Sequence, residues 1–102
     1  MAKVRVKFFA SYQKMVGERE VEVEVPEGAT VLDLARKLEK TYPQLRGVLL
    51  DGDRLSEEPR ILINGRNIEW LGQENARLKD GDTVAIFPPA AGGVGTLFAP
   101  LA

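Results

Sequence analysis

The sequence predicts an α+β fold, in which a mixed sheet of about five strands carries one main helix packed on one face. Three patterns predict it. Two segments near the N-terminus alternate apolar and charged residues, residues 31–42 repeat apolar side chains at spacings of three and four, and residues 83–87 form a late apolar strand. Alternation with period two is typical of strands, and spacings of three and four are typical of amphipathic helices. With 102 residues, the chain has the size of one domain with one modest core.

The first two predicted strands, residues 4–10 and 19–25, are expected to pair as a hairpin. Their inward positions are apolar: Val4, Val6, Phe8, Val21, Val23 and Val25. Their outward positions carry opposite charges, basic on the first strand and acidic on the second: Lys3, Arg5, Lys7, Glu20, Glu22 and Glu24. A slip of one residue would turn the valines to water, so the pattern fixes the register. Residues 11–17 between the strands are predicted to be a turn region that holds one helical turn.

The main helix is predicted to start after Thr30, a favourable N-cap, with Asp33 three residues later as a weaker form of the capping box. One apolar stripe follows, made of Val31, Leu34, Ala35, Leu38 and Tyr42. Pro43 ends the helix, because the residue before a proline disfavours the helical conformation. The stripe is interpreted as core packing.

Residues 45–59 are predicted to be a long connection. Their acidic residues invite comparison with a calcium loop, but the spacing lacks the regular ligand positions of such a loop, and no metal site is predicted. Residues 61–68 predict a hairpin with a tight Asn64-Gly65 turn. Residues 73–78 are expected to be irregular or a short helical turn, and residues 78–82 a turn before the last strand.

This order of elements constrains the topology. A crossover helix of this length favours a following strand that runs parallel to the one before it, on the right-handed side. The first and last strands then become parallel central neighbours in the sheet. The arrangement is a β-grasp, or ubiquitin-like, fold.

Composition excludes several classes of function. The chain has no cysteine and no histidine, so disulfides, cysteine zinc sites, thiol nucleophiles and the commonest general base are absent. A net charge of −1 gives no nucleic-acid footprint. The N-terminus lacks the apolar block of a signal peptide and no run reaches membrane-spanning length, so a cytoplasmic location without membrane association is expected. No cofactor is predicted.

The C-terminal segment has an unusual composition, with no charged residue from Phe87 to the end of the chain. Pro88 and Pro89 cannot continue a central strand and hold the chain extended. Gly92 and Gly93 then remove the side chains, which suits a thread that enters a narrow slot in a partner. A frayed terminus is the plainer alternative. We expect a β-grasp domain at residues 1–87, an extended diglycine thread at 88–93 and a tail at 94–102.

Several motifs together resemble the MoaD/ThiS family of small ubiquitin-like proteins. They are the Lys7-Phe8-Phe9-Ala10 segment, Gly28-Ala29-Thr30-Val31 at the helix start, Ile63-Asn64-Gly65 at a hairpin, and residues 79–93 with the Gly-Asp-x-Val, Phe-Pro-Pro and Gly-Gly pattern. The family includes the small subunit of molybdopterin synthase, the thiamine sulfur carrier, ubiquitin-related modifiers and small archaeal modifier proteins. The resemblance covers residues 3–93.

The resemblance implies a carrier or tag and not an enzyme. In the family, a ubiquitin-activating-type adenylating enzyme uses ATP to adenylate the carboxylate of the terminal glycine, here Gly93. The acyl adenylate then yields an amide with a lysine of a target protein, or a thiocarboxylate that delivers sulfur. The leading interpretation is a protein modifier. The alternative is a sulfur carrier for molybdopterin, thiamine or tRNA thiolation, which would serve a sulfur-accepting synthase subunit. A third is a binding module that is never conjugated.

The chain departs from the family pattern because Val94 follows Gly93, which therefore has no free carboxylate. The resemblance leaves three explanations. A processing metalloprotease of the deubiquitinase type cuts the bond between Gly93 and Val94, the protein has lost carrier function, or the tail is an artificial extension.

Strand parity also predicts a contact surface. If Phe8 and Ile86 face the helix, Phe9 and Phe87 face away, side by side at the ends of two parallel strands. Together with Pro88 and Pro89, they are predicted to form an exposed aromatic surface that binds the activating enzyme beside the start of the thread. Ordinary exposed apolar residues are the alternative interpretation.

Overall fold

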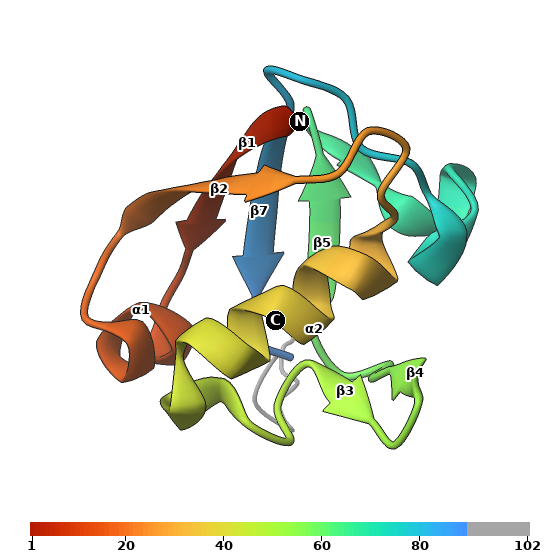
Figure 1. Cartoon of the computed structure of the whole chain (residues 1–102). Coiled ribbons are helices and arrows are strands. Elements are labelled where there is room, and N and C mark those ends of the chain that lie inside the picture. Colours follow the sequence, from red (N-terminus) through yellow and green to blue (C-terminus); the bar gives the residue numbers. More distant parts are fainter. Residues whose placement is uncertain (90–102) are drawn as a thin grey trace.

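The computed structural model describes residues 1–89 and shows a five-stranded mixed sheet with the order β2-β1-β7-β5-β6. The strands are β1 (Ala2–Phe8), β2 (Glu20–Val25), β5 (Arg60–Ile63), β6 (Arg66–Asn67) and β7 (Thr83–Phe87). The main helix, α2 (Val31–Thr41), crosses one face of the sheet (Figure 1). This architecture is the predicted β-grasp fold.

The registers of the strands agree with the charge pattern. β1 and β2 pair antiparallel, with Lys3 opposite Glu24, Arg5 opposite Glu22 and Lys7 opposite Glu20. β1 and β7 pair parallel at the centre of the sheet, as predicted. β5 is antiparallel to β7, and β2 is antiparallel to β1. Because β1 and β7 are parallel, β5 runs in the same direction as β2. The strands before and after the α2 crossover are therefore parallel, as predicted.

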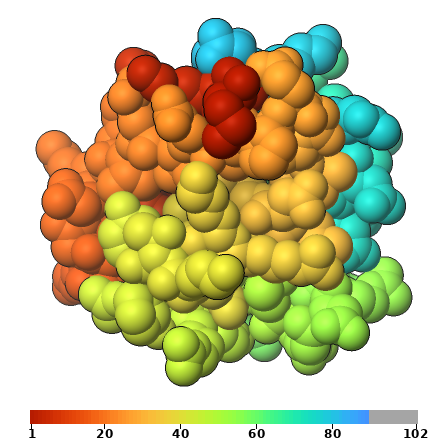
Figure 2. Space-filling model, viewed as in Figure 1, coloured from red at the N-terminus to blue at the C-terminus, as the bar shows by residue number. Residues whose placement is uncertain are grey.

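The α2 helix begins with a complete capping box. The Thr30 hydroxyl accepts a hydrogen bond from the Asp33 amide at 3.2 Å, and the Thr30 amide donates to the Asp33 carboxylate at 3.0 Å. Val31, Leu34, Ala35 and Leu38 of the predicted stripe are buried, and Tyr42 packs edge-on against Phe8. On this side, α2 and the segments that flank it cover the sheet (Figure 2).

Short elements complete the fold, some of them expected and others not. The helix α1 (Ser11–Val16) forms where one helical turn was expected, and it buries Tyr12 and Val16. The expected long connection holds a two-stranded sheet made of β3 (Leu50–Asp51) and β4 (Arg54–Leu55). The 3-10 turn η3 (Gln73–Asn75) lies where an irregular segment or a short helical turn was expected, whereas η1 (Pro43–Leu45) and η2 (Ile68–Trp70) were not predicted.

Polar residues of the family-like motifs tie the strands together at the end of the sheet where β7 starts. The Asn64 side chain accepts a hydrogen bond from the Thr83 amide at 2.9 Å and donates one to the Asp82 carboxylate at 2.9 Å. The Asp80 carboxylate accepts from the Lys3 amide at 2.8 Å. Positive φ values of 51° at Asn64 and 84° at Gly65 fit the predicted tight hairpin turn. These residues therefore serve the fold, and the C-terminal segment leaves from the opposite end of β7.

Among residues 1–89, no helix combines the length and the apolar character needed to cross a membrane. Within the same range, no group of three acidic, histidine or cysteine side chains is arranged to hold a metal ion. The predicted site residues Gly92, Gly93 and Val94 lie outside the described residues, as do the predicted tail and most of the predicted thread.

Candidate docking site at the root of the C-terminal thread

The site is built where two parallel strands end side by side. Phe8 of β1 lies opposite Ile86 of β7, and both side chains are buried against the helix. The pairing continues for one more hydrogen bond, from the Phe9 amide to the Ile86 carbonyl at 3.2 Å. Successive residues of a strand point to opposite faces, so Phe9 and Phe87 emerge together on the face of the sheet that α2 does not cover.

The two rings stack on each other. Their centroids are 4.2 Å apart and their planes are inclined by 11°. An aromatic pair of this kind contributes about 0.5–1.5 kcal/mol beyond the area that it buries. The predicted side-by-side arrangement is thus present, but both side chains are half-buried instead of freely exposed, because each ring covers a face of the other. The stack holds the last residue of β7 in place, directly before Pro88.

Two further residues extend the apolar surface, and the sequence analysis did not single them out. Leu62 of β5 lies opposite Ala85 of β7, and both are partly buried on the same face as the aromatic pair. The alternation along β5 points to Leu62, because Ile61 and Ile63 are buried and the residue between them must face the other way. We call Phe9, Leu62, Ala85 and Phe87 the outer patch.

Cationic side chains border the outer patch. Arg60 of β5 lies opposite Phe87, and Lys7 of β1 lies opposite Ala85. Pro88, half-buried, and Pro89, exposed, continue the chain from the edge of the patch. A partner that covers the patch therefore meets apolar surface at the centre and positive charge at the rim, the arrangement in which a few buried aromatic anchors carry most of the binding energy.

The backbone at Ala10 is strained. Its φ of 52° and ψ of −129° lie in a region that residues with a Cβ atom rarely adopt. This conformation turns the chain sharply from Phe9 into α1 and leaves the Phe9 ring on the outer face. A strained backbone of this kind persists where the surrounding packing holds it in place. Here the strained residue directly follows Phe9 of the aromatic stack.

Tyr12 of α1 follows this turn in the sequence, and its side chain is buried. Burial raises the pKa of its phenol, and the carboxylate of Glu58 raises that pKa further. The phenol is therefore neutral throughout the physiological range, and α1 acts as a packing element at the root of the thread.

The fold and these motifs agree with comparisons to known proteins. The model of the ThiS family matches residues 6–93, which is most of the chain. The protein belongs to the ThiS family. Small archaeal modifier protein 3 of Haloferax volcanii is 37% identical over 90 residues, which cover 88% of this chain and 98% of that protein.

Two further proteins of known type are similar to the chain. The molybdopterin synthase sulfur carrier subunit of Chlamydomonas reinhardtii is 31% identical over 91 residues, which cover 88% of this chain and 98% of that protein. The solution structure of small archaeal modifier protein 1 of Methanosarcina acetivorans is 37% identical, superposes with a TM-score of 0.79, and covers 91% of this chain and 98% of the other. The ThiS-family chain is accordingly a small ubiquitin-like protein, not an enzyme.

The family match stops at Gly93, whereas the sequence goes on through Val94. The residues of the predicted thread therefore belong to the family pattern, and those of the predicted tail stand outside it.

Proposed function

We propose that this ThiS-family protein is the precursor of a ubiquitin-like protein modifier. A metalloprotease of the deubiquitinase type hydrolyses the peptide bond between Gly93 and Val94. A ubiquitin-activating-type enzyme then joins the new Gly93 carboxylate to the α-phosphate of ATP and releases pyrophosphate. The amino group of a target lysine attacks the acyl carbon, AMP leaves, and an isopeptide bond forms.

One observation carries this proposal. The chain resembles a small archaeal modifier protein over nearly the whole length of that relative, and the family match ends on the second glycine of a diglycine pair. Glycine permits close backbone approach, so Gly92 and Gly93 suit passage through a slot that leads to the nucleotide. Whatever follows Gly93 has to be removed before its carboxylate can react.

The outer patch is the surface we assign to the activating enzyme. It lies next to Pro88 and Pro89, so an enzyme seated on the patch would receive the chain that leaves β7. In this assignment, residues 1–87 are the recognised domain, residues 88–93 are the thread and residues 94–102 are the part removed.

A sulfur carrier is the second candidate, supported by the resemblance to a molybdopterin synthase sulfur carrier subunit. Both functions share the acyl adenylate. In the carrier, a sulfur nucleophile displaces AMP, and the Gly93 carboxylate becomes a thiocarboxylate. The product formed from the adenylate separates the two candidates.

The direct biochemical test is ATP–pyrophosphate exchange by the ubiquitin-activating-type enzyme of the same cells. We expect a chain ending at Gly93 to support exchange and the chain of residues 1–102 to support none, because the latter has no carboxylate at Gly93. Equal exchange with both chains, or none with either, would contradict the proposal. In the full reaction, lysine adducts of other proteins support the modifier and a thiocarboxylate supports the carrier.

A further inference from the structure

A groove of about 860 Å³ opens beside β5. β7 pairs with all four residues of β5, from Arg60 to Ile63. On the other edge of β5, β6 pairs with Leu62 and Ile63 alone. The Asn64 amide donates to the Thr83 carbonyl, so in the same register the backbone groups of Arg60 face β7 and those of Ile61 face the open edge, which lines the groove. An unpaired strand edge is a template for an added strand.

The floor of the groove is apolar and rigid. Pro59, Ile61 and Ile68 line it and are buried, and Leu55 and Leu62 are half-buried. The wall opposite β5 is held by Glu74, whose carboxylate accepts a hydrogen bond from the Leu55 amide at 3.1 Å and pairs with Arg54 at 3.2 Å. The groove is thus preformed by packed elements.

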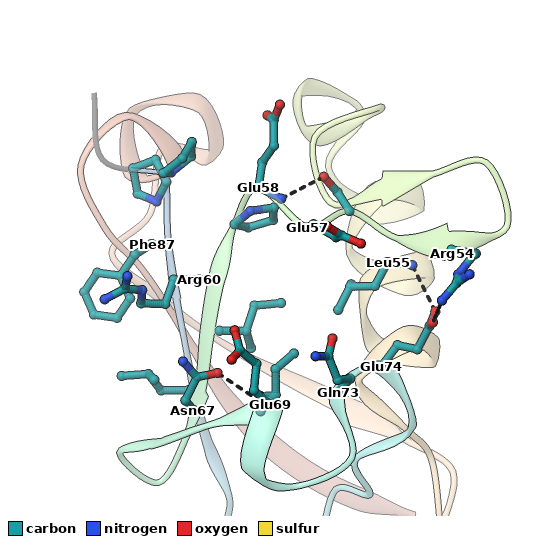
Figure 3. A pocket seen from close by; sticks show the side chains of 17 residues that line it. Arg54, Leu55, Glu57, Glu58, Arg60, Asn67, Glu69, Gln73, Glu74 and Phe87 are labelled. Atoms are coloured by element: carbon teal, nitrogen blue, oxygen red, sulfur yellow. Dashed lines mark hydrogen bonds and ion pairs between the residues drawn. The ribbon is translucent and has the colours of Figure 1, made fainter. Parts of the chain in front are cut away.

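The rim of the groove is acidic. With Glu74 paired to Arg54, the remaining charged groups of the lining are the carboxylates of Glu57, Glu58 and Glu69 and the guanidinium of Arg60. Figure 3 shows the Glu58 side chain pointing away from the opening and the Arg60 side chain lying toward Phe87. Glu57 and Glu69 are therefore the carboxylates that face the opening. None of the three glutamates takes part in an ion pair within the described residues. Glu57 and Glu69 lie on opposite sides of the opening (Figure 3).

We propose that this groove binds an extended, basic segment of a partner protein. The segment pairs with the N–H and C=O of Ile61 on the open edge of β5. Because side chains of an extended segment alternate between two faces, its apolar residues lie on the floor and its lysines or arginines reach the glutamates of the rim. Phe87, Pro88 and Pro89 line one part of the same groove, so the bound segment lies beside the root of the thread.

This site adjoins the outer patch, with which it shares Leu62 and Phe87, and it does not depend on cleavage or activation. The groove requires positive charge in its partner, whereas the outer patch presents Lys7 and Arg60 at its own rim.

The experiment uses the full chain, labelled with ¹⁵N, and two synthetic capped hexapeptides that alternate lysine with valine or glutamate with valine. We expect the lysine–valine peptide to give saturable amide shifts around Leu55, Ile61 and Glu69, weakened by added salt. The glutamate–valine peptide is expected to bind at least about tenfold more weakly. No saturable shift, equal binding of both peptides, or shifts centred on another strand edge would overturn the proposal.

Two matched triple variants test which carboxylates contribute to peptide binding. The triple variant Glu57→Gln, Glu58→Gln and Glu69→Gln keeps side-chain size and is expected to weaken binding of the lysine–valine peptide about threefold to tenfold. The control triple variant Glu18→Gln, Glu22→Gln and Glu24→Gln removes as many carboxylates at and before the opposite edge of the sheet. We expect it to leave the affinity unchanged. Equal loss in both triple variants would show general charge attraction and overturn the assigned site.

Discussion

The rings of Phe9 and Phe87 stack at a centroid distance of 4.2 Å. Phe9 directly follows β1, the first strand in the sequence, and Phe87 is the final residue of β7, the last strand. The stack joins the two central strands on the face that the helix leaves open, directly before Pro88. It therefore links the fold to the C-terminal segment on which the proposed chemistry depends.

The first prediction concerns this stack. The double variant Phe9→Ala and Phe87→Ala, made in the chain ending at Gly93, is expected to lower kcat/KM for adenylation by about tenfold to a hundredfold, because aromatic anchors dominate binding surfaces. The measurement is ATP–pyrophosphate exchange at varied protein concentration.

The control for this variant is Trp70→Ala, which removes an aromatic side chain that is 84% exposed and lies outside the outer patch. It is expected to leave exchange unchanged. Normal kinetics in the double variant, with an intact circular dichroism spectrum, would remove the outer patch as the docking surface.

The second prediction concerns the strained turn after Phe9. Ala10→Gly is expected to raise the free energy of unfolding by about 1 kcal/mol, because glycine adopts positive φ without the steric cost of a Cβ atom. Urea denaturation measures the change. Ala35→Gly makes the same chemical change inside α2, where it is expected to lower the free energy of unfolding by at least about 0.5–1 kcal/mol. A loss of stability in Ala10→Gly would show that the turn is unstrained.

The third prediction concerns pH. The raised pKa of Tyr12 means that the folded state holds the phenolic proton more tightly than the unfolded state, whose tyrosine pKa is about 10. The stabilisation is complete below that pH and is lost as the pH rises through it toward the folded-state pKa. The free energy of unfolding should fall by up to about 1.4 kcal/mol per pH unit from this group alone.

The variant Tyr12→Phe isolates that contribution, since it keeps the ring and removes the titrating group. We expect wild type and variant to show parallel stabilities from neutral pH to just below the tyrosine pKa, and wild type to lose stability more steeply above it. Parallel curves through the whole alkaline range would contradict the assigned shift.

Local patterns were sufficient to predict much of the fold. The Thr30–Asp33 capping box forms within one helical turn, and the apolar alternation of β1 and β2 fixes a register that the structure reproduces. Parity along β1 and β7 was sufficient to place Phe9 beside Phe87. Their half-burial was not predictable in the same way, because it arises from stacking between distant parts of the chain.

The elements that sequence reasoning missed depend on contacts from outside themselves. The strands β3 and β4 have two residues each, too few for a period. The Glu39 carboxylate of α2 accepts hydrogen bonds from the Leu49 and Leu50 amides, both at 2.9 Å, and Glu74 accepts one from the Leu55 amide. The groove beside β5 likewise combines three distant stretches of sequence, which no local pattern connects.

The central claim is that Gly93 becomes the reactive end of the protein. The intact mass of the protein recovered from its own cells tests it most directly. The account predicts protein molecules whose chain ends at Gly93, or, after proteolytic digestion, C-terminal peptides ending at Gly93 that are joined to lysines of target proteins. If the carrier chemistry operates, the free chain ending at Gly93 has one carboxylate oxygen replaced by sulfur. Recovery of only chains that still carry Val94 after Gly93 would contradict it.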